Sequence, residues 1–178
     1  MTKKLETLVE HQKRTKKQWP DALKCASSNV RIELKNAFPS VKFSVRISRF
    51  TGGDDLRVEW TDGPTVKQVK EIVGKYAAGS FDPMTDYYDY DSSDFNATYG
   101  DAKYIFTTRN HSREALQKVA DDVAADWKVP MPEVKISEYD GNAYIEDEGV
   151  NVSSGDNTWD HHWMARQVIY RTIQELAF

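Results

Sequence analysis

The sequence predicts an α+β fold: a small, mainly antiparallel sheet of about four strands, with helices packed on it and an N-terminal helical arm. Three observations support this class. Apolar residues recur at helical spacing along the chain, strict alternation marks two short segments joined by a glycine turn, and no internal repeat is present. The length of 178 residues suits one domain with a helical appendage. We therefore expect a helical arm and helix at 1–38 and an α+β domain at 39–178.

The first elements follow from periodicity, proline and turn residues. Apolar residues lie at helical spacing from residue 2 to residue 37. Pro20 divides this stretch into two helices, because proline disfavours helix in the residue before it but is accepted in a first helical turn. Residues 43–49 and 56–60 alternate between apolar and polar side chains around the turn residues 51–55, which predicts an antiparallel hairpin.

The remaining elements are marked by the same signals. A helical stripe at 66–76 opens at Pro64 or Thr65 and ends by Gly79. Residues 104–108 predict a third strand, and a helix from Ser112 to Trp127 follows it. Residues 134–136 predict a fourth strand, residues 144–145 a further short strand, and a last helix begins at 157 or 158.

Charge is distributed unevenly along the chain. Residues 1–50 carry 12 basic and four acidic residues, a net charge of +8, whereas residues 51–178 carry 12 basic and 24 acidic residues, a net charge of −12. This asymmetry indicates two surfaces with different partners. The alternative is a set of solvated faces. On the arm, Lys13, Arg14, Lys16 and Lys17 could neutralise phosphates, so nucleic-acid binding through the basic N-terminal helix is one alternative function.

The most informative segment is an acidic, aromatic stretch without a basic residue between Lys75 and Lys103. Its carboxylates must stay solvated or meet a cation, and tyrosine is favoured at protein interfaces. We therefore expect a recognition loop that binds a protein with a basic surface. The expected contact residues are Asp82, Asp86, Tyr87, Tyr88, Asp89, Tyr90, Asp91 and Asp94, with further ring area from Phe95 and Tyr99. The alternative is a loop that folds onto its own sheet with the rings inward.

The chain shows no sequence pattern that is typical of catalysis. It has no GxSxG, Walker or GxGxxG motif, and the adjacent His161 and His162 would point about 100° apart on a helix, without a third ligand at i+4. The sole cysteine, Cys25, is expected to be a half-buried helix residue. We expect no enzyme activity, no cofactor and no metal, and a metal-dependent hydrolase that uses the Asp-rich loop is the second alternative function.

The compartment is predicted from the single cysteine and from the hydropathy pattern. No apolar run approaches the roughly 20 residues that a membrane-spanning helix needs. One cysteine cannot form a disulfide within the chain, and no signal peptide is evident, so a reducing cytoplasm is the expected location.

Several segments, in order, resemble the large polyvalent protein-associated domain family, the twenty-ninth of its series. They are Phe43–Arg46, Val58–Thr65, Val69, Phe81–Asp86 and Tyr99–Arg109, within residues 40–110. The resemblance implies an α+β module carried by phages and conjugative elements, in some cases inside long proteins that support entry or counter host defence. It implies no activity. The expected function is therefore a non-enzymatic accessory protein in the bacterial host cytoplasm, which binds a host or element-encoded protein, such as a defence or nucleic-acid-handling factor.

Overall fold

The computed structural model describes residues 7–8, 21–82, 84, 87–90, 93–127, 134–137, 141–145 and 158–177. The chain divides into two compact units: Met1–Trp60 with Val66–Thr108, and Thr61–Thr65 with Arg109–Phe178. The predicted arm with Lys13, Arg14, Lys16 and Lys17 lies outside the described residues. The α+β class is confirmed, although the strands are divided among three small sheets rather than one.

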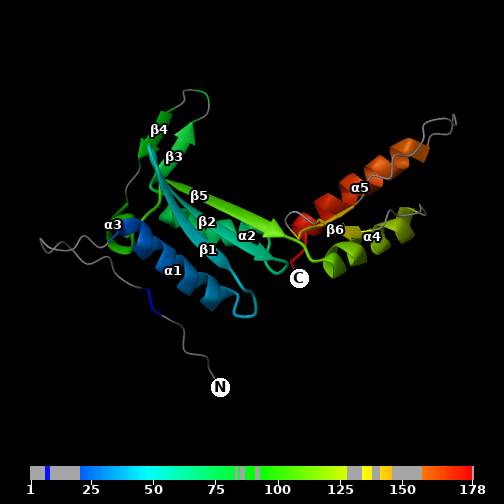
Figure 1. The fold of residues 1–178 in the computed structure, drawn as a ribbon, viewed down its shortest axis with the longest axis horizontal. Coiled ribbons are helices and arrows are strands. Elements are labelled where there is room, and N and C mark those ends of the chain that lie inside the picture. Colours follow the sequence, from blue (N-terminus) through cyan, green and yellow to red (C-terminus); the bar gives the residue numbers. More distant parts are fainter. Residues whose placement is uncertain are drawn as a thin grey trace, which may run out of the picture. The chain divides into compact units, whose positions relative to one another are not determined.

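The first unit contains most of the secondary structure (Figure 1). In chain order it comprises α1 (Ala22–Ala37), β1 (Ser44–Phe50), β2 (Gly53–Thr61), α2 (Val66–Val73), the 3₁₀ helix η1 (Gly74–Tyr76), β3 (Gly79–Asp82), β4 (Tyr87–Tyr90), α3 (Asp94–Tyr99) and β5 (Tyr104–Asn110). Every element that the sequence predicts between residues 21 and 110 is present. The elements β3, β4 and α3 replace the expected loop of residues 80–101.

Its main sheet has the strand order β1-β2-β5. Strands β1 and β2 are antiparallel, with Val45 opposite Val58 and Ile47 opposite Leu56. The arrows of β2 and β5 point the same way in Figure 1. In agreement, the N–H of Lys103, just before β5, donates to Asp54 near the start of β2. Because β1 and β2 are antiparallel while β2 and β5 run in the same direction, the sheet is mixed.

Helices α1 and α2 cover one face of this sheet. The apolar side chains of that face share a core with both helices: Leu23, Ala26, Val30, Leu34, Val45, Leu56, Val58, Trp60, Val69, Val73, Tyr76 and Ala102 are all buried. Burial of each Leu or Val side chain of this kind stabilises the fold by about 1.5–3 kcal/mol. Helix α1, which the sequence groups with the arm, therefore belongs structurally with the sheet.

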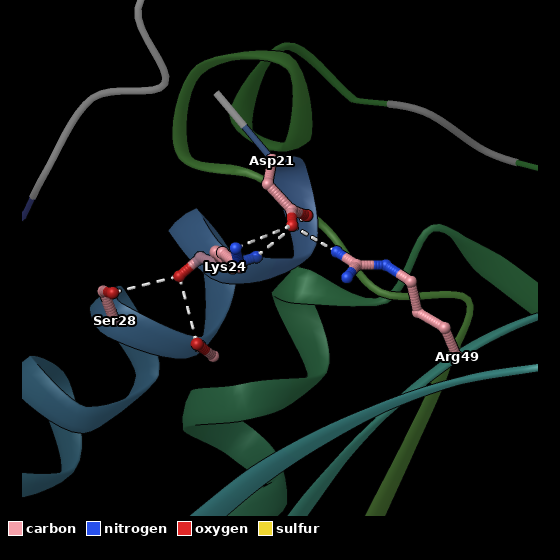
Figure 2. Close-up of polar contacts among 5 residues, drawn as sticks. Asp21, Lys24, Ser28 and Arg49 are labelled. Carbon is pink, nitrogen blue, oxygen red and sulfur yellow. Dashed lines mark hydrogen bonds and ion pairs between the residues drawn. The ribbon is translucent and has the colours of Figure 1, made fainter. Parts of the chain in front are cut away.

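The start of α1 is fixed by a polar cap that also joins the helix to β1 (Figure 2). Asp21 is the N-cap, and its carboxylate accepts from the Lys24 N–H at 3.3 Å and forms an ion pair with Arg49 of β1. Ser28 donates to the Lys24 carbonyl at 3.0 Å within the same turn. Burial alone would raise the pKa of Asp21, but the Arg49 guanidinium and the Lys24 N–H lower it. The cap therefore acts as a carboxylate at neutral pH.

The second unit has a separate core. It comprises α4 (Arg113–Trp127), the antiparallel pair β6 (Val134–Ile136) and β7 (Ala143–Ile145), and α5 (Thr158–Glu175). Both helices and both strands contribute buried apolar residues, namely Leu116, Val119, Ala120, Val123, Val134, Ile145, Ile169 and Ile173. These elements confirm the strands and helices that the sequence predicts after residue 112. The fourth predicted strand pairs with β7 and not with the main sheet.

Candidate functional site

The acidic, aromatic segment forms a hairpin in the first unit. Strands β3 and β4 are antiparallel, with Gly79 opposite Tyr90 and Phe81 opposite Tyr88. Gly79 is required by the pairing, because a Cβ atom there would lie 1.9 Å from the backbone oxygen of Asp89. The hairpin is followed by α3, which begins with a capping box between Ser93 and Asn96. The described part of the predicted recognition loop therefore consists of two paired strands and a capped helix.

Tyr88 and Lys103 attach this hairpin to the main sheet. The Tyr88 hydroxyl donates to the Lys103 carbonyl, and its ring lies 5.4 Å from the Tyr104 ring in an edge-on arrangement. The Lys103 ammonium lies 5.0 Å from the Tyr88 ring centroid and 5.7 Å from that of Tyr90, and it donates to the Gly52 carbonyl at 2.7 Å. The hairpin is thus held against both β5 and the β1–β2 turn by hydrogen bonding and cation–π contacts.

This environment changes the acidity of two side chains. Burial raises the pKa of Tyr88 to about 12, with a further contribution from Tyr90 and Tyr104. Partial desolvation lowers the pKa of Lys103, but the Tyr90 hydroxyl and the neighbouring Tyr104 outweigh it and the net direction is upward. At neutral pH, the anchor therefore consists of a neutral phenol and an ammonium cation.

The predicted contact residues divide into three groups. Asp89, Tyr90 and Asp94 are exposed, and Tyr90 retains 63% of its accessible surface. Tyr88 is half-buried, and Phe95 and Tyr99 pack against the core of the first unit, so these three rings face their own protein. Asp86 and Asp91, and the side chains of Asp82 and Tyr87, lie outside what the structure describes. Within the described residues, no ion pair neutralises Asp89 or Asp94.

A second surface, which the sequence analysis did not assign to binding, lies on the main sheet. Its aromatic residues are Phe50 of β1 and Tyr104 and Phe106 of β5, and Arg46 and Arg57 stand on the same face; we call this set the aromatic face. Phe50 and Phe106 are each about half exposed. The signal was present as the alternation Tyr104-x-Phe106, but alternation alone does not say which side of a strand is buried.

A small cavity of about 300 Å³ lies beside the start of β5 in the first unit. Its lining comprises Lys70, Val73, Gly74, Ala77, Gly79, Tyr88, Lys103, Tyr104, Ile105 and Thr107. This volume is at the lower limit of small-molecule sites. The lining contains no His, Cys, Asp or Glu, and its titratable side chains are Lys70, Lys103, Tyr88 and Tyr104. Of these, Tyr88 and Lys103 already make the contacts that hold the hairpin.

Cys25 and the adjacent His161 and His162 are the other groups that the sequence offers for chemistry. Cys25 is half-buried, as expected, and burial raises the pKa of its thiol despite a hydrogen bond from Asn29. A neutral thiol is a poor nucleophile. The side chains of His161 and His162 lie outside the described part of the chain. Among the residues that are described, no group of three or more His, Cys, Asp or Glu side chains could hold a metal ion, and no helix is long and apolar enough to span a membrane.

Arg109 organises a polar cluster in the second unit. Its buried guanidinium donates to the carbonyls of Ile173 at 2.9 Å and Gly63 at 3.0 Å, and Asp62 accepts from the Ser112 N–H at 2.9 Å. Burial lowers the pKa of nearby His111, and the Arg109 charge lowers it further, so this imidazole is neutral. The cluster joins the turn at Thr61–Thr65 to α5, while neither buried ring nitrogen of His111 has a hydrogen-bond partner among the described residues.

Comparison with protein families decides the affiliation of the chain. The model described as Large polyvalent protein associated domain 29 matches residues 22–112. The chain belongs to this family. Comparisons with curated proteins and with solved structures give no match. The match runs from the first residue of α1 to just past β5, so the family domain contains both the hairpin and the aromatic face, and α4 to α5 follow it.

Proposed function

We propose that this family member is a non-enzymatic accessory protein of a phage or conjugative element, which acts in the bacterial cytoplasm by binding a basic protein surface. The family affiliation supports the accessory role. One observation carries the binding role. The hairpin is anchored through Tyr88, while Asp89 and the following Asp94 are exposed and form no ion pair with any residue that the structure describes. The partner is a host or element-encoded protein.

The hairpin is already attached to the main sheet before it meets a partner. A rigid acidic projection loses little conformational entropy when it binds, and its charge accelerates encounters with a basic surface. Tyr90 adds a large exposed ring beside Asp89, and rings of this kind contribute contact area at protein interfaces.

The experiment is site-specific photo-crosslinking of the full chain in bacterial cells. A photoreactive residue replaces Tyr90, and in a control chain it replaces Glu114, an exposed residue at the start of α4. The expected result is a host or element-encoded protein that is crosslinked from position 90 only. Its binding is then measured with purified components.

The double variant Asp89→Asn with Asp94→Asn is expected to weaken that binding by roughly tenfold and to lower its salt dependence. The matched control is Asp122→Asn with Asp126→Asn, which removes two exposed carboxylates from α4. Unchanged affinity in the hairpin variant, or equal loss in the control variant, would contradict the proposal.

A further inference from the structure

On the open face of the main sheet, the hairpin contacts Tyr104 through Tyr88, but Phe50 and Phe106 remain about half exposed. Side chains of β1 and β2 that point away from α1 and α2 include Arg46 and Phe50, which lie opposite Arg57 and Gly53. Single exposed apolar side chains are common, but Phe50 and Phe106 both adjoin Tyr104 and so form one contiguous exposed aromatic patch, which is a feature of binding surfaces. The inference below concerns this aromatic face and does not depend on the proposed function of the hairpin.

The three rings of the aromatic face lie nearly parallel to one another. The Phe50 and Tyr104 rings are 6.2 Å apart at 20°, and the Tyr104 and Phe106 rings are 6.4 Å apart at 16°. Gly53 of β2 allows this arrangement across the sheet. A Cβ atom at that position would lie 2.6 Å from Lys103 Cδ and 3.5 Å from the Tyr104 ring.

In the two ion pairs on this face, the arginine is more exposed to solvent than its acidic partner. Arg46 pairs with Glu59 at 3.0 Å, and their side chains are 70% and 34% exposed. Arg57 pairs with Asp55 at 3.1 Å, and their side chains are 55% and 3% exposed. In both pairs the acid is the more buried partner, so the outer layer of this face is basic although each pair is neutral.

The basic groups are placed beside the rings. The Arg57 guanidinium lies 5.8 Å from the Phe106 centroid, and the Lys103 ammonium lies 5.4 Å from that of Tyr104. Arg46 and Arg57 are directly opposite each other across the two strands, and like charges in this position repel. The Glu59 and Asp55 carboxylates already offset part of this repulsion, and an anion that contacts both arginines would offset it further.

We propose that the aromatic face binds single-stranded nucleic acid. Unpaired bases would stack on Phe50, Tyr104 and Phe106, and Arg46, Arg57 and Lys103 would contact the phosphates. Stacking on aromatic rings beside basic groups is the general mode by which proteins hold single strands without sequence preference. A duplex does not offer its base faces to such rings, and an apolar protein partner would desolvate the arginines.

The experiment uses the full-length protein and fluorescein-labelled 12-nucleotide probes, oligo-dT and oligo-U, with a duplex of the same length for comparison. Binding is followed by fluorescence anisotropy at low salt. We expect the single strands to bind more tightly than the duplex. Phe106→Ala and Phe50→Ala should each weaken binding by roughly tenfold or more, and Phe106→Trp should restore it where Phe106→Leu does not. Arg46→Gln should reduce the salt dependence.

The matched controls are Ile136→Ala and Tyr144→Ala, which truncate exposed apolar side chains of the second unit. These variants should bind the probes like the wild type, and the double variant Asp89→Asn with Asp94→Asn should not weaken binding, because it removes negative charge. The proposal is overturned by absence of binding at low salt, by equal affinity for the duplex, or by full affinity in Phe50→Ala and Phe106→Ala. A concentration-dependent dimer that these two variants abolish would assign the face to a second copy of the chain and would also overturn it.

Discussion

The hairpin and the aromatic face belong to the same family domain but present opposite charges. On the hairpin, Lys103 lies over the rings of Tyr88 and Tyr90 while Asp89 is exposed. On the aromatic face, Asp55 is buried while its partner Arg57 is half exposed. The comparison teaches that the charge of a surface depends on which member of each pair faces solvent. The net charge of the chain does not reveal it.

The substitution with the largest expected effect lies between α3, which follows the hairpin, and α1, which packs on the main sheet. Gly100 ends α3 with φ at 84° and ψ at 168°, a backbone conformation that is essentially limited to glycine. A Cβ atom there would also lie 2.2 Å from the Ala22 carbonyl oxygen of α1. Backbone strain and overlap together should make Gly100→Ala cost about 3 kcal/mol, measured as a shift of the urea unfolding midpoint.

Gly141→Ala is the matched control for this prediction. Gly141 has φ at 71°, but nothing lies within 4 Å of a Cβ atom at that position. The control substitution therefore isolates backbone strain from overlap, and it should cost about 1 kcal/mol. Equal costs at the two positions would show that the contact between α3 and α1 does not restrict Gly100.

A second substitution separates the two regions. Gly79→Ala places a methyl group against the Asp89 backbone, which cannot move without breaking the β3–β4 pairing. We expect a cost of about 2 kcal/mol and faster amide hydrogen exchange in the hairpin, without faster exchange in β1 and β2. Gly74→Ala, where the added methyl group meets no atom within 4 Å, should leave exchange unchanged. Faster exchange throughout the main sheet would show that the hairpin is part of the sheet's own cooperative unit.

The smallest effect is expected from loss of the Tyr88 hydrogen bond that attaches the hairpin to the main sheet. Tyr88→Phe removes the hydroxyl that donates to the Lys103 carbonyl and should cost about 1 kcal/mol. Because burial raises the pKa of Tyr88 from 10.0 to about 12, its stabilising contribution is complete below pH 10 and is lost as pH rises from 10 to 12.

Wild-type protein should therefore lose more of its unfolding free energy over that pH interval than Tyr88→Phe does. Urea titrations at pH 9 and at pH values up to 12 would measure this difference, with Tyr144→Phe as the control for an exposed tyrosine. Parallel pH profiles for the wild type and Tyr88→Phe would contradict the buried anchor.

The sequence predicted the fold class and most of the elements because they depend on local patterns. The alternation in β1 and β2 and the helical stripe of α1 are signals that neighbouring residues carry by themselves. The expected loop at residues 80–101 was the main difference. Its pattern of Asp and Tyr is a poor guide to short strands, whose stability here comes from Lys103 and Tyr104, distant in sequence.

The candidate site was predicted only in part. Composition indicated that Asp89 and Tyr90 would be available, and the structure leaves both exposed. The direction of Phe95 could not be read from the sequence, because its ring contacts Tyr76 only after α3 packs beside η1. The aromatic face was missed for a related reason: Phe50 and Tyr104 are 54 positions apart and meet only when β5 joins the sheet.

The sequence by itself determined the α+β class, the family and the order of most helices and strands, since periodicity, turns and caps act over a few residues. Only the tertiary structure decided which side of each strand faces water and which member of each ion pair is exposed. Those outcomes depend on burial and on pairing between distant segments, and local sequence contains neither. The acidity of the hairpin could therefore be read from composition, whereas the basic aromatic face is a product of packing.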